Sequence, residues 1–388
     1  MNQQSLPAWT YHSEEFFQLE KQHLFFNSWQ LVCHKSNIKN PGDYFTFKFL
    51  GESVVVLHGK DNTIRAFHNV CTHRAARLLD GDQGNCKGRI KCPYHNWQFE
   101  HDGSLKSVPY KDQFVDFDQD SHGLTSIDIE FWQGFIFVCL QSDPAKRGPS
   151  VAEQFAPVLD EILPYQFEQL EPLDRITLRP RPVNWKQIAD NYVDALHIPV
   201  SHPGLTALIG NSYGIDVVGD LHKMWGDLKT TRKDTISNRL YKSILPHSDH
   251  LDEALQEHWV YYRAFPNLAF DIYPDQVDFM QFIPVSPTET IIREIPYALK
   301  DNRREMKAAR YLNWRINRQV NKEDTDLVER VQDGMSSSSF TSGPFASSEI
   351  CLIDSANKMR KIIPVSNLET PPPYGQAKSI NDQMLEKR

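Results

Sequence analysis

Apolar and polar residues alternate over short stretches between residues 42 and 150, which is the spacing of half-buried β-strands. Turn-like residues such as the KDN segment at 60–62 separate these stretches. The alternating segments are YFTFKFL, SVVVLHG, TIRAFHN, SIDIEFW and GFIFVCL. The pattern therefore predicts a small all-β unit at residues 42–150.

Before this unit, apolar residues follow a helical spacing. Ser13 is a candidate N-cap for a helix within residues 13–30, and the apolar positions of that helix are Phe16, Phe17, Leu24 and Phe25. We expect residues 1–41 to form a helical segment that packs on the second domain.

A second, larger domain is predicted at residues 151–388. Its first residues belong to a proline-containing connection at 144–182. Its strand-like segments are WVYYRAF, LAFDIYP, VDFMQFIPV and TIIREIPYAL, and a long helical pattern follows from about residue 301 to 335. The tail, with Pro371, Pro372 and Pro373, is expected to be irregular. The fold class is therefore α+β, with an antiparallel sheet in the second domain.

Composition narrows the function classes. A net charge of −8 with dispersed Lys and Arg argues against nucleic-acid binding, because phosphate recognition needs a positive field. The chain has no apolar run long enough to cross a bilayer, and its start, MNQQSLPAWTYHSEE, lacks a signal-peptide pattern. We therefore expect a cytoplasmic protein. Its six cysteines are then reduced thiols, and clustered thiols in that compartment more often bind metal.

Two Cys/His pairs form the first metal constellation. Cys71 and His73 are separated by one residue, and Cys92 and His95 follow, separated by two. Two such pairs on loops of a β-domain can converge on a dinuclear cluster, with the thiolates on one iron and the imidazoles on the other, as in a Rieske [2Fe–2S] centre. Cys86 lies between the pairs without a His at the required offset and is expected to be a bystander.

A structural zinc site is the alternative for these four residues. Zinc sites favour C-x2-4-C and H-x3-5-H pairings, which the C-x-H and C-x2-H pairs fit poorly. We therefore favour the iron–sulfur cluster. Pro93, Tyr94 and Trp97 are expected to surround it with apolar surface.

The run C-x-H…C-P-Y-H-x-W resembles the N-terminal domain of Rieske non-haem iron oxygenases, the aromatic-ring-hydroxylating dioxygenase α-subunit family. Two departures fall in loops: the gap between the pairs is slightly longer than is usual, and Asn96 stands where the family more often has Gly.

The segment NWKQIADNYVDALHIPVSHPGL contains a second constellation, Asp194, His197 and His202, preceded by Asn191. If NWKQIADNYVDALH is helical, Asn191, Asp194 and His197 share a face, and Pro199 ends the helix so that His202 can turn back. Two His and one carboxylate on one side of Fe(II) leave positions open for O₂ and substrate. A pair of ordinary hydrogen-bonded histidines is the alternative.

The resemblance to the family implies roles for three acidic residues. It implies that the iron ligand precedes a Glu by five positions in the helix NKEDTDLVERVQ, so Glu329 indicates Asp324; Glu323 and Asp326 are near alternatives. It also implies that Asp194 bridges His95 of a neighbouring subunit to His197. Asp194 and Asn191 are accordingly the candidate catalytic residues, with His197, His202 and Asp324 as iron ligands.

The resemblance covers nearly the whole chain and implies a helix-grip (Bet v 1-like) catalytic domain and a head-to-tail homotrimer. The implied activity is that of an oxygenase component that hydroxylates or N-demethylates a small organic substrate with O₂. Its cofactors are the [2Fe–2S] cluster and mononuclear Fe(II). Because the chain has no nucleotide-binding fingerprint, its electrons would come from a separate NAD(P)H-dependent flavin or iron–sulfur reductase, in some systems with a ferredoxin.

The substrate is the least determined feature. Size and C-terminal pattern resemble the branch that acts on choline, betaines or small aromatic acids more than the large ring dihydroxylases. Aromatic residues after the iron motif either line a planar pocket or form a cation–π cage, although most should belong to the core. They are Trp225, Tyr241, Trp259, Tyr261, Tyr262, Phe265, Phe270, Tyr273, Phe279 and Phe282. The alternatives to an oxygenase are an electron-transfer Rieske protein and a zinc-stabilised binding module.

Overall fold

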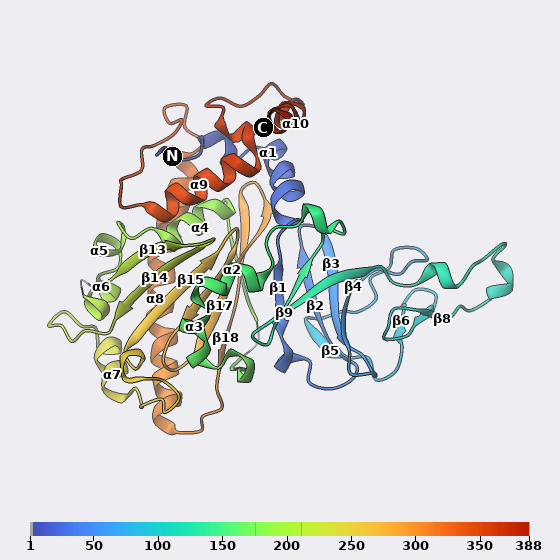
Figure 1. The fold of residues 1–388 in the computed structure, drawn as a ribbon, viewed down its shortest axis with the longest axis horizontal. Coiled ribbons are helices and arrows are strands. Elements are labelled where there is room, and N and C mark those ends of the chain that lie inside the picture. Colours follow the sequence, from blue (N-terminus) through green and yellow to red (C-terminus); the bar gives the residue numbers. More distant parts are fainter. Residues whose placement is uncertain (1–2, 175, 211, 388) are drawn as a thin grey trace. The chain divides into compact units, whose positions relative to one another are not determined.

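The computed structural model describes residues 3–174, 176–210 and 212–387, and their contacts divide the chain into two units. The small unit comprises Phe26–Val151 and Phe167–Glu171. The large unit comprises the residues up to Phe25, Ala152–Gln166, and the residues from Pro172 onwards. Figure 1 shows the helices and strands of each unit along the chain.

The small unit is built on an antiparallel sheet in the order β1-β10-β9-β4-β3-β2-β5. Its strands are β1 (Gln30–His34), β2 (Asp43–Phe49), β3 (Glu52–His58), β4 (Ile64–His68), β5 (Gln83–Asn85), β9 (Ser126–Trp132) and β10 (Phe135–Cys139). A second, smaller sheet contains β6 (Ile90–Lys91), β7 (Gln98–Phe99) and β8 (Leu105–Ser107). The Cys71 and Cys92 loops belong to this unit, and both cysteines join its buried apolar cluster.

Strand β1 lies within the segment that the sequence pattern assigns to the N-terminal helices. All five of its residues are buried, so no polar–apolar alternation marks it in the sequence. A fully buried run of this length cannot be distinguished from a helical segment by periodicity. The small unit therefore begins before residue 42.

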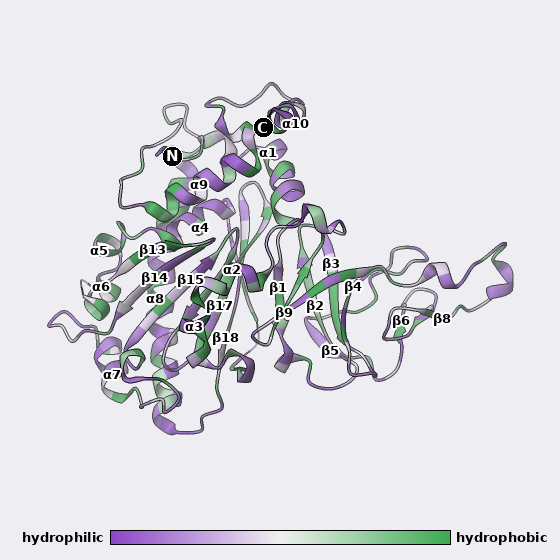
Figure 2. Cartoon of the chain, viewed as in Figure 1, coloured by the Kyte–Doolittle hydropathy of each residue, from purple (hydrophilic) through white to green (hydrophobic). Residues whose placement is uncertain are grey.

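The large unit contains an antiparallel sheet in which the order β18-β17-β16-β15-β14-β13 runs across the sheet and β12 pairs with β18. These strands are β12 (Thr177–Arg181), β13 (Gly214–Val218), β14 (Leu221–Asp227), β15 (His258–Ala264), β16 (Leu268–Ile272), β17 (Val277–Ser286) and β18 (Glu289–Ala298). The short β11 (Glu171–Pro172) lies at the boundary between the units along the chain. Hydrophobic and hydrophilic residues are interspersed along the strands of both units (Figure 2).

The helices of the large unit pack on this sheet and on one another. They are α1 (Glu14–Leu19), α3 (Leu159–Ile162), α4 (Trp185–Val193), α5 (Ile198–Ser201), α6 (Pro203–Ile209), α7 (Ile236–Ile244), α8 (Arg304–Gly334), α9 (Ile350–Ile362) and α10 (Ala377–Glu386); α2 (Val151–Phe155) begins in the connection. Ala309, Leu312 and Ile316 of α8 share a buried cluster with Trp259 and Tyr273 of the sheet. A sheet that packs on a long helix confirms the expected α+β class.

The N-terminal segment docks on α4. Ser13 accepts a hydrogen bond from the Phe16 N–H, so it is the N-cap of α1 as predicted. A π-helical turn at Glu20–Phe25 follows α1. Its first residue, Glu20, forms an ion pair with Lys186 of α4, with the carboxylate 2.6 Å from the ammonium and both side chains buried. The tail is irregular at its three prolines, but it continues into α10, which the sequence pattern did not indicate.

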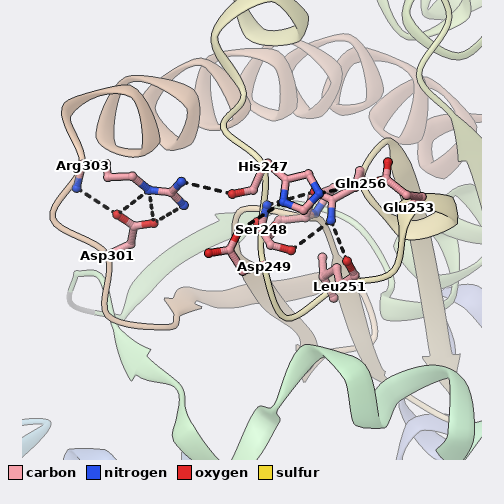
Figure 3. A network of polar contacts seen from close by, with 9 residues as sticks. His247, Ser248, Asp249, Leu251, Glu253, Gln256, Asp301 and Arg303 are labelled. Carbon is pink, nitrogen blue, oxygen red and sulfur yellow. Dashed lines mark hydrogen bonds and ion pairs between the residues drawn. The ribbon is translucent and has the colours of Figure 1, made fainter.

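A polar network fixes the beginning of α8 (Figure 3). Arg303, the residue before α8, donates to Asp301 and to the His247 carbonyl at 3.1 Å. His247 belongs to the loop between α7 and β15, which Gln256 closes by donating to the carbonyls of Ser248 and Leu251. This network holds one end of the helix that carries Asp324. In the part of the chain that the structure describes, no helix is long and apolar enough to cross a membrane.

Candidate iron–sulfur and iron sites

Two loops of the small unit have the same backbone geometry around their cysteines. The Cys71 N–H donates to the Ala76 carbonyl, and the Ala75 N–H donates back to the Cys71 carbonyl. In the second loop, the Cys92 N–H donates to Trp97 and the Asn96 N–H donates back to Cys92. Each loop is thus a tight turn that presents a Cys and, a few residues on, a His.

Each turn contains a left-handed residue four positions after its cysteine. Ala75 has φ 58° and Asn96 has φ 56°. Gly adopts this conformation without strain, and Asn is one of the residues that tolerate it best. This requirement explains why Asn can replace the more usual Gly at position 96.

The side chains of the two loops meet in pairs: Cys71 lies beside Cys92, and His73 lies beside His95. Cys71 and Cys92 are buried, and the rings of His73 and His95 meet edge to face with centroids 4.6 Å apart. Trp97 stacks on His73 at 4.7 Å and is buried, whereas Tyr94 is 57% exposed and Pro93 is also exposed. Tyr94, although exposed, lies with its ring centroid 3.8 Å from that of His95, so Trp97 and Tyr94 both pack on the imidazoles as expected, whereas a contact of Pro93 with the cluster stays a prediction.

A bound cluster fits an unusual feature of these residues. Among the described residues, the Nδ1 atoms of His73 and His95 are buried and have no hydrogen-bond partner. A buried polar atom without a partner is costly, and a metal ion would satisfy both imidazoles at once. Burial, with the neighbouring Cys92 thiol, raises the pKa of Cys71 to about 11, so a thiolate here needs a nearby cation. Cys86 is partly buried at the edge of the same apolar cluster.

In the large unit, the candidate iron residues follow α4, which begins at its N-cap Asn184 and ends at Val193. Asp194 is extended, and its carboxylate accepts the Leu196 N–H at 2.7 Å. This local hydrogen bond competes with the helix and ends it. The prediction of one helix from Asn184 through His197 is therefore wrong. Pro199 does not end a helix either, because it lies in the first turn of α5, where a missing N–H is harmless.

His197, His202 and Asp324 nevertheless come together. Their ligand atoms lie within 4.8 Å of one another. The Nε2 atoms of the two histidines are 3.0 Å apart, and Asp324 Oδ1 lies 2.9 Å from His202 Nε2 and 3.4 Å from His197 Nε2. Three ligand atoms that face one point form a two-histidine, one-carboxylate site with an open side.

The three candidate acids on α8 point in different directions. Asp324 points to both Nε2 atoms, whereas Glu323 Oε2 lies 2.8 Å from Nδ1 of His202, on the opposite side of the ring. Asp326 is exposed. Residues two apart on a helix face different directions, so Asp326 cannot join Asp324. The role of Glu323 as a partner of His202 was missed by the sequence reasoning, which treated it only as an alternative ligand.

Two further residues contact His197. Asp194 Oδ2 lies 3.1 Å from its Nδ1, and Asn191 Nδ2 lies 3.4 Å from its Nε2. The Nδ1 atoms of both histidines therefore face carboxylates, which fixes the ring orientations and leaves the Nε2 atoms to face the centre of the site.

The carboxylates give this site a negative potential. Burial works against a charged His197, but its hydrogen bonds with Asp194 and Asp324 outweigh burial and raise its pKa to about 9. Burial alone would raise the pKa of Asp194, but the hydrogen bond with His197 outweighs burial. The pKa of Asp194 therefore lies below its usual range. The same negative potential that favours an imidazolium favours a bound divalent metal ion.

The iron-site residues open onto a cavity of the large unit. Its aromatic lining consists of Tyr192, Tyr213, Tyr261 and Tyr273, and Asp271 and Arg181 contribute charged groups. Of the aromatic residues that the sequence suggested, only Tyr261 and Tyr273 line it, whereas Tyr241 and Trp259 belong to a buried core cluster. Tyr192, Tyr213 and Asp271 were missed: Tyr192 belongs to α4, Asp271 to β16, and Tyr213 directly precedes β13, and no local motif marks them.

Comparisons with known protein families match both units. Residues 28–126 match the Rieske [2Fe-2S] domain. Residues 167–364 match the ring hydroxylating alpha subunit (catalytic domain). The second match spans half of the chain and contains all the candidate mononuclear-iron residues.

Among curated relatives, the carnitine monooxygenase oxygenase subunit of Acinetobacter pittii is 30% identical over 338 residues, covering 85% of this chain and 86% of that protein. The subunit of the same name from Escherichia coli is 37% identical over 204 residues, so the match spans about half of that protein's length, 53%, and 52% of this chain. A solved quaternary ammonium Rieske monooxygenase, described for carnitine oxidation and inter-subunit electron transfer, superimposes with a TM-score of 0.77 at 25% identity, covering 92% of this chain and 95% of that one.

Proposed function

We propose that this chain, which belongs to the Rieske ring-hydroxylating oxygenase family, is the oxygenase component that oxidises a small quaternary ammonium compound with O₂. The observation that carries the proposal is the placement of His197, His202 and Asp324 around one point on the wall of a cavity. That cavity combines tyrosine rings with a buried carboxylate, Asp271.

The family's [2Fe–2S] domain and catalytic domain assign one cofactor to each unit. Cys71 and Cys92 would hold one iron of the cluster, and His73 and His95 the other. His197, His202 and Asp324 would hold the mononuclear iron. When bound, the cluster supplies single electrons and the mononuclear iron supplies O₂ activation.

The protein's own residues prepare these sites. With a metal ion bound, Asp194 and Glu323 would accept hydrogen bonds from the Nδ1 atoms of His197 and His202, so that each Nε2 would keep its lone pair for the metal. Asn191 places an amide beside His197 Nε2, where it can orient a polar group at the open side of the site. The apolar and aromatic cavity lining limits the access of water, which strengthens every electrostatic interaction inside.

Electrons must also travel between the two units, and the proposed path runs between subunits. Asp194 would accept a hydrogen bond from the N–H of His197 and, across a subunit boundary, one from the N–H of His95 of a neighbouring subunit. The proposal includes a homotrimer and a separate reductase. Support comes from the solved quaternary ammonium monooxygenase, whose description includes inter-subunit electron transfer.

The choice of a quaternary ammonium over an aromatic acid rests on charge. Asp271 is 7% exposed and lines the cavity, so a substrate cation beside it would stabilise its carboxylate, and an aromatic acid has no cation to offer. Tyrosine faces beside a carboxylate suit a trimethylammonium group instead. The relatives agree with this choice, since two of them are carnitine monooxygenase oxygenase subunits.

The test is substrate-stimulated O₂ uptake by anaerobically purified protein with a surrogate reductase. We expect γ-butyrobetaine or choline to stimulate uptake and benzoate to have no effect. Stimulation by benzoate alone would refute the substrate assignment.

Two variants distinguish an oxygenase from an electron-transfer protein. His197→Ala should abolish O₂ uptake while the visible and EPR signals of the cluster remain. His247→Ala, an exposed loop histidine outside the cavity lining, is the matched control and should retain uptake. Unchanged uptake in His197→Ala would favour a pure electron-transfer protein, and colourless protein that contains zinc would favour a binding module.

A further inference from the structure

The strand register places a carboxylate in the middle of the cavity face of the sheet. Asp271 of β16 pairs with Tyr261 of β15 on one side and with Asp278 of β17 on the other. Residues that pair directly across antiparallel strands project from the same face. Tyr273, two positions after Asp271, also lies on this face and lines the cavity.

Three tyrosines surround Asp271. The Tyr192 hydroxyl of α4 donates a hydrogen bond to Asp271 Oδ1. The rings of Tyr261 and Tyr273 meet edge to face with centroids 6.0 Å apart, so their faces point in different directions. An anionic group backed by aromatic rings of different orientation is suited to a cation that carries methyl groups, because such a cation binds ring faces and needs no hydrogen-bond acceptor.

The surroundings of Asp271 are poor in positive charge. Glu294 adds to its negative environment, and the Asp278 carboxyl lies on the neighbouring strand. Burial raises the pKa of Asp271 to about 7, opposed by the hydrogen bond from Tyr192. Arg181 is the one Lys or Arg among the described residues that line the cavity. A cation in the cavity would therefore stabilise the Asp271 carboxylate.

We propose that Asp271, with Tyr192, Tyr261 and Tyr273, forms a cation-selecting subsite that binds the trimethylammonium group of the substrate. Asp271 is the residue that distinguishes this cation from a neutral molecule of the same shape. The inference rests on the proposed function and goes further, because it assigns the selection of charge to one side chain.

The experiment compares each cation with its carbon isostere. The pairs are γ-butyrobetaine with 5,5-dimethylhexanoate, and choline with 3,3-dimethylbutan-1-ol; each pair differs only in the positive charge. Binding to anaerobic holoenzyme is measured by calorimetry for the wild type, for Asp271→Asn, and for the matched control Asp278→Asn. Asp278 is a half-buried carboxyl that pairs with Asp271 on the same face, but it is not among the residues that line the cavity. The cluster's visible spectrum checks that each variant is folded.

We expect Asp271→Asn to weaken binding of the better cation by about tenfold and to change binding of its isostere by less than about twofold. Asp278→Asn should leave the preference for the cation in place. Equal weakening of cation and isostere by Asp271→Asn, or no weakening of either, would overturn the inference while wild-type oxidation of the cation keeps the proposed function. A wild-type enzyme that binds neither cation would overturn both.

Discussion

Glu323 offers a sharp test of how the iron site is organised. Its Oε2 lies 2.8 Å from His202 Nδ1, and its Oε1 accepts a hydrogen bond from Gln319, one turn earlier on α8, also at 2.8 Å. His202 itself is almost completely buried. If Glu323 holds the Nδ1 proton, replacing it by Ala removes the constraint that points the Nε2 lone pair at the metal.

The magnitude follows from one charge-assisted hydrogen bond, about 1.5–3 kcal/mol. Because the Glu323 side chain is 23% exposed, water screens part of this energy, and the lower end applies. At about 1.4 kcal/mol for each factor of ten, Glu323→Ala should weaken Fe(II) binding about tenfold. Ala is a good helix former, so α8 should remain intact.

The assay is anaerobic Fe(II) titration of protein that has lost its mononuclear iron but keeps the cluster, whose absorbance provides an internal check. Glu323→Gln should lie within about threefold of the wild type, because its amide oxygen still accepts from Nδ1. Asp326→Ala, an exposed acid two positions along the same helix, is the control for helix charge. If Asp326→Ala weakens binding as much as Glu323→Ala, or if neither changes it, the orientation argument is refuted.

Two further predictions concern stability. Lys186→Met should destabilise the large unit by about 3–5 kcal/mol in urea unfolding, because it leaves the buried Glu20 carboxylate unpaired. A Glu20→Leu/Lys186→Met double variant should recover most of this loss of stability. A double variant as unstable as the single one would contradict the explanation. In the small unit, burial lowers the pKa of His34 from 6.5 to about 4. The unfolded chain therefore binds an extra proton between these values, and stability should fall as the pH falls from about 6.5 to 4, by about 3 kcal/mol in total. Comparing unfolding of the wild type and His34→Gln across this range isolates the contribution, since the variant should lose that part of the pH slope; equal slopes would count against it.

Sequence patterns predicted the strands β2, β3, β4, β9 and β10 of the small unit and β15 to β18 of the large unit, because the information is local. The strands β1 and β12 to β14 were not predicted, whereas α8 at Arg304–Gly334 agrees with the helical pattern at 301–335. The spacing of Cys71, His73, Cys92 and His95 indicated one shared site, and the structure brings their side chains together. A short Cys–His spacing in the sequence indicates proximity in the structure because each pair lies within a single turn.

The remaining features depend on which side-chain contacts form in the folded chain, and most of these contacts join distant segments. The end of α4 is set by an Asp194 side chain that binds the backbone two residues on. The choice between Glu323 and Asp324 depends on which side of His202 the helix α8 approaches. Asp271 and Tyr192 come from a strand and a helix far apart in the sequence, and only tertiary packing places their side chains in contact.

Helix α4 connects the N-terminal segment to the candidate iron site, since its nine residues serve both. On one face, Lys186 meets Glu20, and Asp190, four residues later, accepts a hydrogen bond from the Tyr11 hydroxyl at 3.2 Å. Ile188 and Asn191 line the cavity. Lys186 and Asn191 belong to the same nine-residue helix, so we expect a change that loosens the buried ion pair to displace the Asn191 amide as well. The N-terminal segment thus contacts the helix that ends directly before Asp194, a neighbour of the candidate iron ligand His197.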